Sequence, residues 1–405
     1  MTFPEKPVLL SVSVIPRHRP PFSLAEFLAA QIGSSPDSLD KLEASIAELL
    51  EMPEAILLPS ARFGIWAGLR LTVPADQAVA VPALNCSAVY EAAIRSGLRA
   101  IFVDCRENSF LMDLNTMPTV SAWVLSELYG LTYELPPESL RPPFCIFDMA
   151  MTIPEKRVLE RLRPSDLALF SFGLGKSGYA GWGGVALTQD KSLARELHRM
   201  VQVSCVGDFS PWLKVQRTLE LGARVLAHWP PLYGFARKIQ GLRHPPSKLL
   251  TLPKNWSREG TQGEEWRRLP VRPEIRMVVH NFVNFAEDAI SRRELEHTYR
   301  CLLQGLNGVV LPAPSNGALS HFTIRLPALA KEPTRQKLWK HGIDAGDVIG
   351  FPSYCNPTIF PNAFKAGQEL LNLPMSQGLK LRHIQSIAKI LSSGSRPGVT
   401  ENFTL

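Results

Sequence analysis

Residues 36–210 alternate between two hydrophobic patterns. Apolar residues at helical spacing predict helices over residues 40–50 and 61–71, the second of which follows a break at Pro59-Ser60. Short, continuous apolar runs are typical of strands buried on both faces of a sheet. Such runs occupy residues 55–58, 78–81, 100–103, 122–125, 145–147, 167–172 and 185–188. Helices that alternate with buried strands predict an α/β fold around a mostly parallel sheet.

The pattern changes after residue 206. Two helical stretches, 213–226 and 231–242, precede a polar, turn-rich segment at 255–262, which indicates an insertion or a subunit contact. The remaining apolar segments predict a smaller α/β unit, with a long helix over 278–303, a strand over 322–326 and helices over 335–341 and 378–391. The resulting prediction is an N-terminal arm (1–35), a large domain (36–275, with a helical insertion at about 206–275) and a small C-terminal domain (276–405).

Composition indicates a globular protein with ordinary core-forming capacity. The chain has 405 residues, of which 45% are hydrophobic, and no apolar run is long enough to cross a bilayer. The first ten residues lack the apolar stretch and cleavage site of a secretory signal, so we expect a cytoplasmic protein. The six cysteines show no paired close spacing, so we expect reduced, buried thiols and neither a metal site nor a disulfide framework.

The net charge of +7 is scattered along the chain instead of forming a basic block with interleaved aromatic residues, so a nucleic-acid partner is not expected. Positive potential does suit an enzyme with anionic small-molecule ligands. The stretch 213–242 mixes leucines with basic residues and is compatible with a membrane-surface helix or with a helical hairpin buried in a subunit contact. We favour the hairpin, so membrane contact is not expected.

The segment 173–178 is rich in glycine and carries a lysine directly after a strand. The sequence is Gly173-Leu174-Gly175-Lys176-Ser177-Gly178. A phosphate-binding P-loop is disfavoured because Phe170 stands where its first glycine must be. A dinucleotide fingerprint is disfavoured because the glycines that follow, up to Gly184, cannot open a helix. Taken alone, this stretch is equally compatible with a hairpin that carries a solvated lysine at its tip.

Short motifs elsewhere in the chain occur in an order that is specific to one enzyme family. In chain order they are Pro59-Ser60-Ala61-Arg62-Phe63-Gly64, Val81-Pro82-Ala83, Leu128-Tyr129-Gly130, Phe147-Asp148-Met149-Ala150-Met151, the lysine segment, Gly183-Gly184-Val185-Ala186-Leu187-Thr188-Gln189-Asp190, Gly342-Ile343-Asp344-Ala345-Gly346 and Leu371-Asn372-Leu373-Pro374. Together they resemble DegT/StrS-type sugar aminotransferases over residues 36–392. The resemblance implies fold type I of the pyridoxal phosphate enzymes: a large domain with a mostly parallel seven-stranded sheet, and a smaller C-terminal α/β domain.

The resemblance also implies roles for individual residues. Lys176 would form a Schiff base with pyridoxal 5'-phosphate and move the substrate proton, and Asp148 would keep the pyridine nitrogen protonated. The cofactor-binding set that it implies is Ser60, Ala61, Arg62, Cys86, Asp148, Met151, Ser171 and Lys176. Structural interpretations stay open beside these roles: a helix cap for Asp148 or Ser60, and a hydroxyl bonded to the backbone for Ser171.

Several positions depart from the family pattern. Ala61 and Arg62 replace Gly-Thr, so a guanidinium could hold the phosphate in place of a hydroxyl. Cys86 stands where many relatives stack an aromatic ring on the cofactor, and Met151 stands where glutamine or histidine contacts that ring. The tyrosine-histidine landmark before the C-terminal strand survives only as Ser320-His321, and we assign His321 a structural role.

Substrate contacts are the least constrained part of the prediction. Tyr179 follows the lysine segment, Arg276 lies near the Asn-Tyr-Arg-Met region of the family, and Arg325 is in the C-terminal strand, so these three are candidate substrate residues. For the two arginines a surface salt bridge is the competing interpretation, and for Tyr179 it is a place in the core.

The predicted function is transfer of an amino group, with glutamate as donor, to a keto group of a nucleotide-linked sugar, as in polysaccharide or antibiotic biosynthesis. The resemblance further implies a homodimer with shared active sites. The alternatives are an elimination, cyclisation or decarboxylation on the same fold with the same cofactor, motivated by Cys86 and Met151, and a homologue that has lost turnover.

Overall fold

The computed structural model of the protein describes residues 14–32, 39–107, 109–205, 210–243, 264–347, 349–376 and 378–393. The turn-rich segment predicted at 255–262 lies outside these residues. Within them, no helix is both long enough and apolar enough to cross a membrane.

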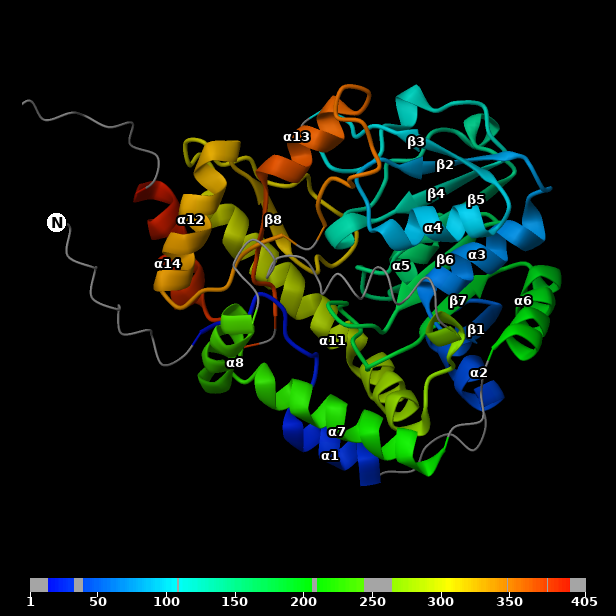
Figure 1. The fold of residues 1–405 in the computed structure, drawn as a ribbon, viewed down its shortest axis with the longest axis horizontal. Helices are drawn as coiled ribbons and strands as arrows, with labels where there is room; N and C mark the ends of the chain where they lie inside the picture. Colours follow the sequence, from blue (N-terminus) through cyan, green and yellow to red (C-terminus); the bar gives the residue numbers. More distant parts are fainter. Residues whose placement is uncertain are drawn as a thin grey trace, which may run out of the picture.

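A seven-stranded sheet forms the core of the part of the molecule on the right of Figure 1, and the predicted α/β class is confirmed. Its strands are β1 (Glu54–Leu58), β2 (Ala78–Pro82), β3 (Arg99–Val103), β4 (Ala122–Ser126), β5 (Phe144–Asp148), β6 (Leu167–Ser171) and β7 (Gly184–Thr188). Their order across the sheet is β1-β7-β6-β5-β4-β2-β3. The sheet is mostly parallel because only β7 runs against its two neighbours, β1 and β6. The parallel strands therefore end at one common edge.

Helices cover both faces of this sheet. Those that precede the C-terminal part are α1 (Leu24–Ile32), α2 (Leu39–Leu49), α3 (Ala61–Thr72), α4 (Ser87–Arg95), α5 (Lys156–Leu159), α6 (Lys191–Ser204), α7 (Pro211–Ala227) and α8 (Pro230–Arg243). Short 3-10 turns are η1 (Leu114–Thr116), η2 (Leu128–Gly130), η3 (Glu138–Leu140) and η4 (Glu264–Arg267). Helix α3 lies close to β6, since a Cβ added to Gly64 would meet the Leu169 side chain at 2.5 Å. Glycine therefore sets the helix-to-sheet distance here.

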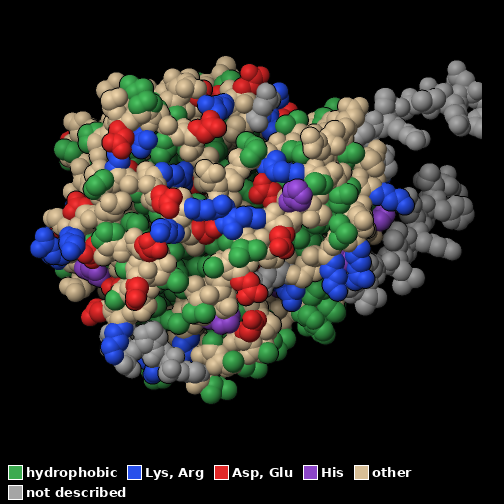
Figure 2. Space-filling view, turned by 180° about the vertical axis from the view of Figure 1, so that it is seen from behind, with side chains coloured by type: hydrophobic (Ala, Val, Ile, Leu, Met, Phe, Trp, Pro, Cys, Tyr) green, Lys and Arg blue, Asp and Glu red, His purple; other side chains and the backbone are tan. Residues whose placement is uncertain are grey.

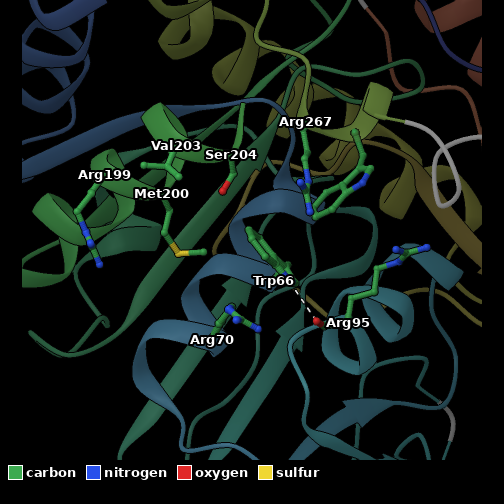
Figure 3. Close-up of a pocket in the computed structure, with 9 residues that line it drawn as sticks. Trp66, Arg70, Arg95, Arg199, Met200, Val203, Ser204 and Arg267 are labelled. Atoms are coloured by element: carbon green, nitrogen blue, oxygen red, sulfur yellow. Dashed lines mark hydrogen bonds between the residues drawn. The ribbon is translucent and has the colours of Figure 1, made fainter. Parts of the chain in front are cut away.

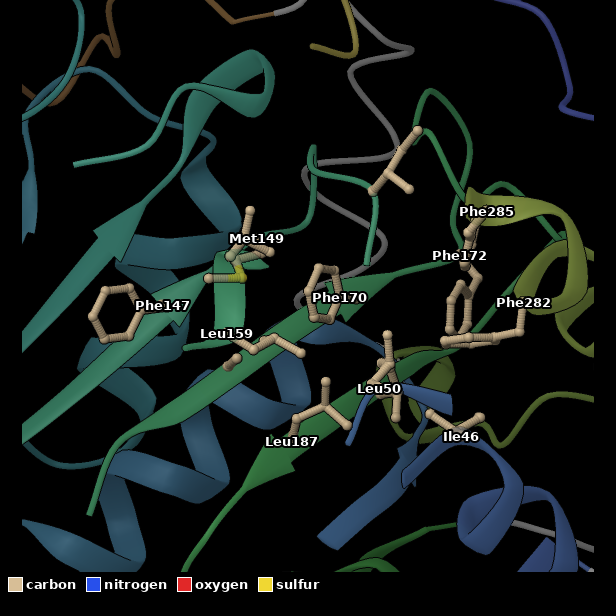
Figure 4. Packing of buried hydrophobic residues seen from close by; sticks show 14 of the residues in the cluster. Ile46, Leu50, Phe147, Met149, Leu159, Phe170, Phe172, Leu187, Phe282 and Phe285 are labelled. Carbon is tan, nitrogen blue, oxygen red and sulfur yellow. The ribbon is translucent and has the colours of Figure 1, made fainter. Parts of the chain in front are cut away.

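Alternate residues of each strand belong to different cores, as expected for a sheet with two covered faces. On β6, Phe170 packs into one cluster and Leu169 into the cluster on the opposite face. Figure 4 shows the first cluster, in which Phe172 packs against Phe282 and Phe285 of the long helix α11. The central strands are thus fully buried, which is why they appear in the sequence as unbroken apolar runs.

The C-terminal part forms around a third core and a two-stranded antiparallel sheet. Its elements are α11 (Arg272–Leu303), β8 (Phe322–Arg325), α12 (Ala328–Lys340), α13 (Pro361–Glu369), β9 (Leu370–Leu373) and α14 (Leu381–Ser393). The long helix α11 joins the two parts of the molecule, because its first half packs on the large sheet and Tyr299 donates a hydrogen bond to the Pro374 carbonyl at 2.9 Å. Loops at the end of the large sheet also pack into the third core, through Leu84, Leu128 and Met151.

The N-terminal segment 14–22 passes across the junction between the two parts. Ile15 forms a parallel bridge with Ile343, and Phe22 stacks on Tyr179 with ring centroids 6.3 Å apart. Helix α1 then packs beside α7 and α11 (Figure 1). The segment is therefore anchored at one end to the C-terminal part and at the other to the lysine loop.

Two surface expectations can be compared with the structure. Figure 2 shows lysine and arginine interspersed with aspartate and glutamate on the face that it displays. The expectation that the cysteines are buried is wrong for Cys86 and Cys301, which are exposed. Cys86 precedes the first turn of α4, and Cys301 lies on a solvent-facing side of α11 beside His297, so neither position is part of a core.

Candidate active site

Lys176 lies in a compact loop that leaves β6 and returns to β7. Its backbone amide donates to the Gly173 carbonyl at 3.3 Å, and its carbonyl accepts from the Tyr179 amide at 3.1 Å. Gly175 adopts a φ of +79°, which a residue with a side chain rarely adopts. The turn therefore needs glycine, and it holds the half-buried Lys176 at the edge of the sheet where the parallel strands end.

Asp148 is the last residue of β5 and lies at the same edge. Its side chain is 8% exposed and accepts hydrogen bonds from the Ser126 hydroxyl at 2.9 Å and from the Ala150 amide at 3.2 Å. Asn85 donates to the same Ser126 oxygen at 2.6 Å. Because these polar residues follow or end three neighbouring strands, β2, β4 and β5, they form one fixed row with the carboxylate at its end.

The charge of Asp148 is opposed by its burial and favoured by its partners. Burial raises the pKa of this carboxyl group, whereas the Lys176 ammonium and the hydrogen bonds from Ser126 and Ala150 lower it. Asp148 and Lys176 are thus close enough for their charges to interact across the sheet edge. The cation that acts on the buried Asp148 carboxylate is Lys176. A second cation nearby would therefore stabilise its ionised form further.

The first turn of α3 provides a third polar feature near this edge. The Ser60 hydroxyl accepts from the Phe63 amide at 3.2 Å, and the Ser60 carbonyl accepts from the Gly64 amide at 3.2 Å. The amides of Ala61 and Arg62 belong to the first turn, where a helix offers no internal acceptor. Together with the helix dipole, they make this turn suited to an anion such as a phosphate group.

Strand β7 approaches this turn so closely that only glycine fits. A Cβ on Gly184 would lie 2.7 Å from the Phe170 carbonyl oxygen and 2.9 Å from the Ala61 nitrogen. We expect Gly184→Ala to displace the turn, to weaken cofactor phosphate binding at least tenfold and to lower stability by about 1–3 kcal/mol. Titration of the purified variant with cofactor, alongside a thermal melt, measures both effects.

Gly350→Ala is the matched control, because a Cβ there meets nothing within 4 Å. It should leave cofactor affinity unchanged. Wild-type affinity in Gly184→Ala would show that the Ser60–Ala61 turn does not contact the phosphate.

The other predicted cofactor residues surround the same edge. Cys86 is exposed, and its amide donates to the Asn85 side-chain oxygen at 2.7 Å, while Met151 is buried in the third core. Arg62 is half-buried and lies within electrostatic reach of Glu91. The Ser171 hydroxyl accepts from the Gly173 amide at 3.4 Å and so supports the start of the lysine loop.

The predicted substrate residues are engaged within the chain. Tyr179 is buried and stacks on Phe22. Arg276 donates to the Gln31 carbonyl, and Arg325 is paired with Glu369 at 2.7 Å. Tyr179, Arg276 and Arg325 thus all have partners within the chain. The structure brings together Lys176, Asp148 and the α3 turn instead.

Two histidines near Lys176 were missed by the sequence analysis as site residues. His321 is 1% exposed at the start of β8, and its ring stacks on that of His18 with centroids 6.0 Å apart. Burial lowers the pKa of both imidazoles well below the usual value, and Arg17, Arg292 and Lys176 act in the same direction. The only sequence signal was the basic run Arg17-His18-Arg19 between two prolines, which has no periodicity.

A cavity away from this chemistry is lined by tryptophans and arginines. It has a volume of about 550 Å³ and opens between α3, α4, α6 and η4. Figure 3 shows Trp66, Arg70, Arg95, Arg199 and Arg267 around it. Neither Lys176 nor Asp148 lines this cavity, so its size does not identify it as the reaction site.

Comparisons with known proteins agree with the geometry. The family model of the DegT/DnrJ/EryC1/StrS aminotransferase family matches residues 23–120, which confirms the resemblance seen in the sequence. No curated protein sequence matches the chain.

Solved structures share the fold over almost the whole chain. The aminotransferase TlmJ from Streptoalloteichus hindustanus is 17% identical, covers 94% of this chain and 98% of its own, and gives a TM-score of 0.68. DesI in the presence of its TDP-sugar product is 16% identical, with 96% and 95% coverage and a TM-score of 0.65. The E. coli GDP-4-keto-6-deoxy-D-mannose-3-dehydratase with bound hydrated PLP is 13% identical, with 94% and 99% coverage and a TM-score of 0.67. At these identities the likeness establishes the fold.

Proposed function

We propose that the protein is a pyridoxal phosphate-dependent aminotransferase that moves an amino group, with glutamate as donor, to a keto group of a nucleotide-linked sugar. One observation carries the proposal: Lys176, Asp148 and the first turn of α3 meet at the edge of the sheet where the parallel strands end. The match to the aminotransferase family model and the fold shared with TlmJ and DesI support the reaction class and the sugar substrate.

The residues present fit this cofactor. Asp148 is a buried carboxylate fixed by two hydrogen bonds, and a protonated pyridine nitrogen would supply the cation that its burial calls for. The α3 turn offers two amides and a helix dipole to the phosphate, and Gly184 leaves the space in front of it free of a Cβ. Cys86, Met151, Arg62 and Ser171 would complete the binding site.

Pyridoxal phosphate supplies the electron sink for the charge left when the substrate carbon loses a proton. The protein supplies the remaining functions. The Lys176 amine would hold the cofactor covalently, and it would remove and return the proton at the substrate carbon. Asp148 keeps the positive charge on the ring nitrogen, and the row from Asn85 to Ser126 keeps Asp148 in place.

A spectroscopic experiment tests this proposal. The purified protein with added cofactor should develop an absorbance band near the visible edge that borohydride abolishes. L-glutamate should convert the bound aldehyde form to the pyridoxamine form, and a keto sugar nucleotide should reverse the conversion. A colourless protein would refute cofactor attachment, and a band that neither glutamate nor any ketone alters would refute transamination.

Elimination remains the second candidate because the related fold also carries the E. coli dehydratase. Elimination is not favoured, because the family model and TlmJ are those of aminotransferases. DesI was solved in the presence of a TDP-sugar product. Release of water from a sugar nucleotide without net amino transfer would select elimination in the same assay.

We also propose a cytoplasmic homodimer with shared active sites. Exposed apolar side chains recur along one side of α7, and they are Trp212, Val215, Leu219 and Leu226. Helix α1, which packs beside α7, exposes Leu28 and Ile32 in addition. An apolar area of this extent is typical of an interaction surface.

We also propose the division into an arm (1–35), a large domain (36–275) and a small domain (276–405), since the two sheets fall in the last two ranges.

Leu219→Glu tests the dimer. Leu219 is 66% exposed, so the substitution leaves the fold of the isolated chain intact. We expect the wild type to sediment as a dimer and the variant to dissociate at least tenfold more readily, because a two-fold axis places the new charge at the interface twice. Leu329→Glu on α12, at a residue 93% exposed, should have no effect. A wild type that sediments as a monomer at all concentrations would refute the proposal.

A further inference from the structure

A group of polar atoms without hydrogen-bond partners lies at the junction of the N-terminal segment, η2 and β8. The Nε2 atoms of His18 and His321 are buried there and unpartnered. The two imidazoles stack at 6.0 Å, and Tyr129 meets His321 edge-on at 5.8 Å. Buried polar atoms that lack partners cost free energy, so two of them on stacked rings indicate a ligand or water that would satisfy them.

The chain holds these rings in place from several directions. The N-terminal segment is fixed on both sides of His18, by the bridge of Ile15 to Ile343 and by the stack of Phe22 on Tyr179. Ser320 Oγ lies 3.1 Å from His321 Nδ1. When this hydroxyl donates to Nδ1, the proton of the neutral ring is on Nε2, which then points into the group as a donor.

The charges that act on the two rings are cationic. Arg17, Arg292 and Lys176 act on both His18 and His321. Arg292 is itself tied to Asp288 at 2.9 Å and to the Met375 carbonyl at 2.6 Å, so it forms a fixed part of the wall. A neutral pair of donors inside a positive field favours an anion over a water molecule.

We propose that His18 and His321 are specificity-determining residues that bind a carboxylate of the amino donor beside Lys176. The proposal rests on the proposed aminotransferase function, because it assigns the donor's anion a place next to the lysine that exchanges the amino group. A carboxylate accepts hydrogen bonds from both Nε2 atoms at once and balances the cations around them. His18 belongs to a segment that precedes residues 23–120, so the family match does not cover it.

Calorimetry with glutarate tests the subsite without any turnover. Glutarate carries both carboxylates of glutamate and no amino group, so it binds without reacting. We expect the wild type to bind it, His18→Leu and His321→Leu to bind it roughly tenfold or more weakly, and His18→Gln, which keeps an N–H donor, to recover part of the affinity. His341→Gln, at an exposed histidine on the end of α12, is the matched control and should behave as the wild type.

The cofactor band separates failure of this proposal from failure of the proposed function. In His18→Leu the borohydride-sensitive band should persist, while the glutamate concentration for half-maximal conversion rises about tenfold and the rate at saturation changes less. L-alanine, which shares only the α-carboxylate, identifies the group bound: an equal loss with both donors assigns the α-carboxylate, and a loss with glutamate alone assigns the γ-carboxylate. Wild-type glutarate affinity and glutamate dependence in His18→Leu and His321→Leu would overturn the subsite, whatever the band shows.

Discussion

Lys176→Ala should abolish the borohydride-sensitive band and lower turnover on the order of 10⁴-fold, because no other described lysine lies at the edge of the sheet with Asp148. Under the proposed function, the substitution removes both the covalent anchor and the group that moves the substrate proton. The cofactor can still bind through its phosphate and ring, so the variant should be recoverable in a noncovalently loaded form. Absorbance spectra and single-turnover conversion by glutamate measure the two losses separately.

Two further variants make this prediction specific. Lys176→Arg retains the positive charge and lacks a nucleophilic amine, so it should be as inactive as the alanine variant although the charge near Asp148 is preserved. Lys191→Ala, at the exposed start of α6, should keep the band and the wild-type rate. Appreciable turnover in Lys176→Ala would assign the chemistry to another group.

Much of this site could be predicted from the sequence because its parts end buried strands. Strands β5 and β6 are continuous apolar runs, so their boundaries were visible, and the residue that follows each run had to lie at the common edge of a parallel sheet. Asp148 and the loop that carries Lys176 are located by this rule alone. The order of the family motifs then distinguished the lysine loop from a simple hairpin.

The parts that were missed depend on contacts that local patterns do not encode. Helix α4 was overlooked because Cys86 provides no side-chain cap to mark its start. The helix predicted at 335–341 begins at Ala328, and Pro333 lies inside it. The helix predicted over 278–303 is α11, which begins at Arg272. Its first turn is marked by a polar contact, in which the Val271 amide donates to the Glu274 side chain at 2.8 Å, and not by an apolar periodicity.

His18 shows the same limit within the site. Its segment has no helical or strand period, and its position is set by contacts with residues far along the chain, at Ile343 and Tyr179. His321 was assigned a structural role because a lone histidine before a strand is common. What the sequence could not show is that the two imidazoles stack and that their Nε2 atoms have no partner.

Asp148→Asn should lower turnover on the order of 10²- to 10³-fold and, in the cofactor-free protein, raise the melting temperature. The amide preserves the size of the side chain; its oxygen can still accept from the Ala150 amide and its NH2 group can donate to the Ser126 hydroxyl, but it carries no charge to hold a proton on the ring nitrogen. The gain in stability follows from the pKa of Asp148, which burial raises. A carboxyl group with a raised folded-state pKa destabilises the fold when it is ionised, and the penalty disappears as the pH falls below the unfolded value of about 4.

The gain in melting temperature should therefore be present at pH 8 and absent near pH 4, and it should vanish when cofactor supplies the missing cation.

Asp166→Asn is the matched comparison, because Asp166 is also buried but lies at the opposite end of the strands. It accepts from the Cys145 amide at 3.1 Å and pairs with Arg163 at 2.9 Å. The substitution leaves the Arg163 guanidinium without its counter-charge, so we expect about 2–4 kcal/mol of destabilisation. Turnover per folded molecule should stay near wild type, because this edge of the sheet takes no part in the chemistry. Equal effects of the two substitutions on melting and on turnover would contradict a division of the sheet into one edge for catalysis and one for stability.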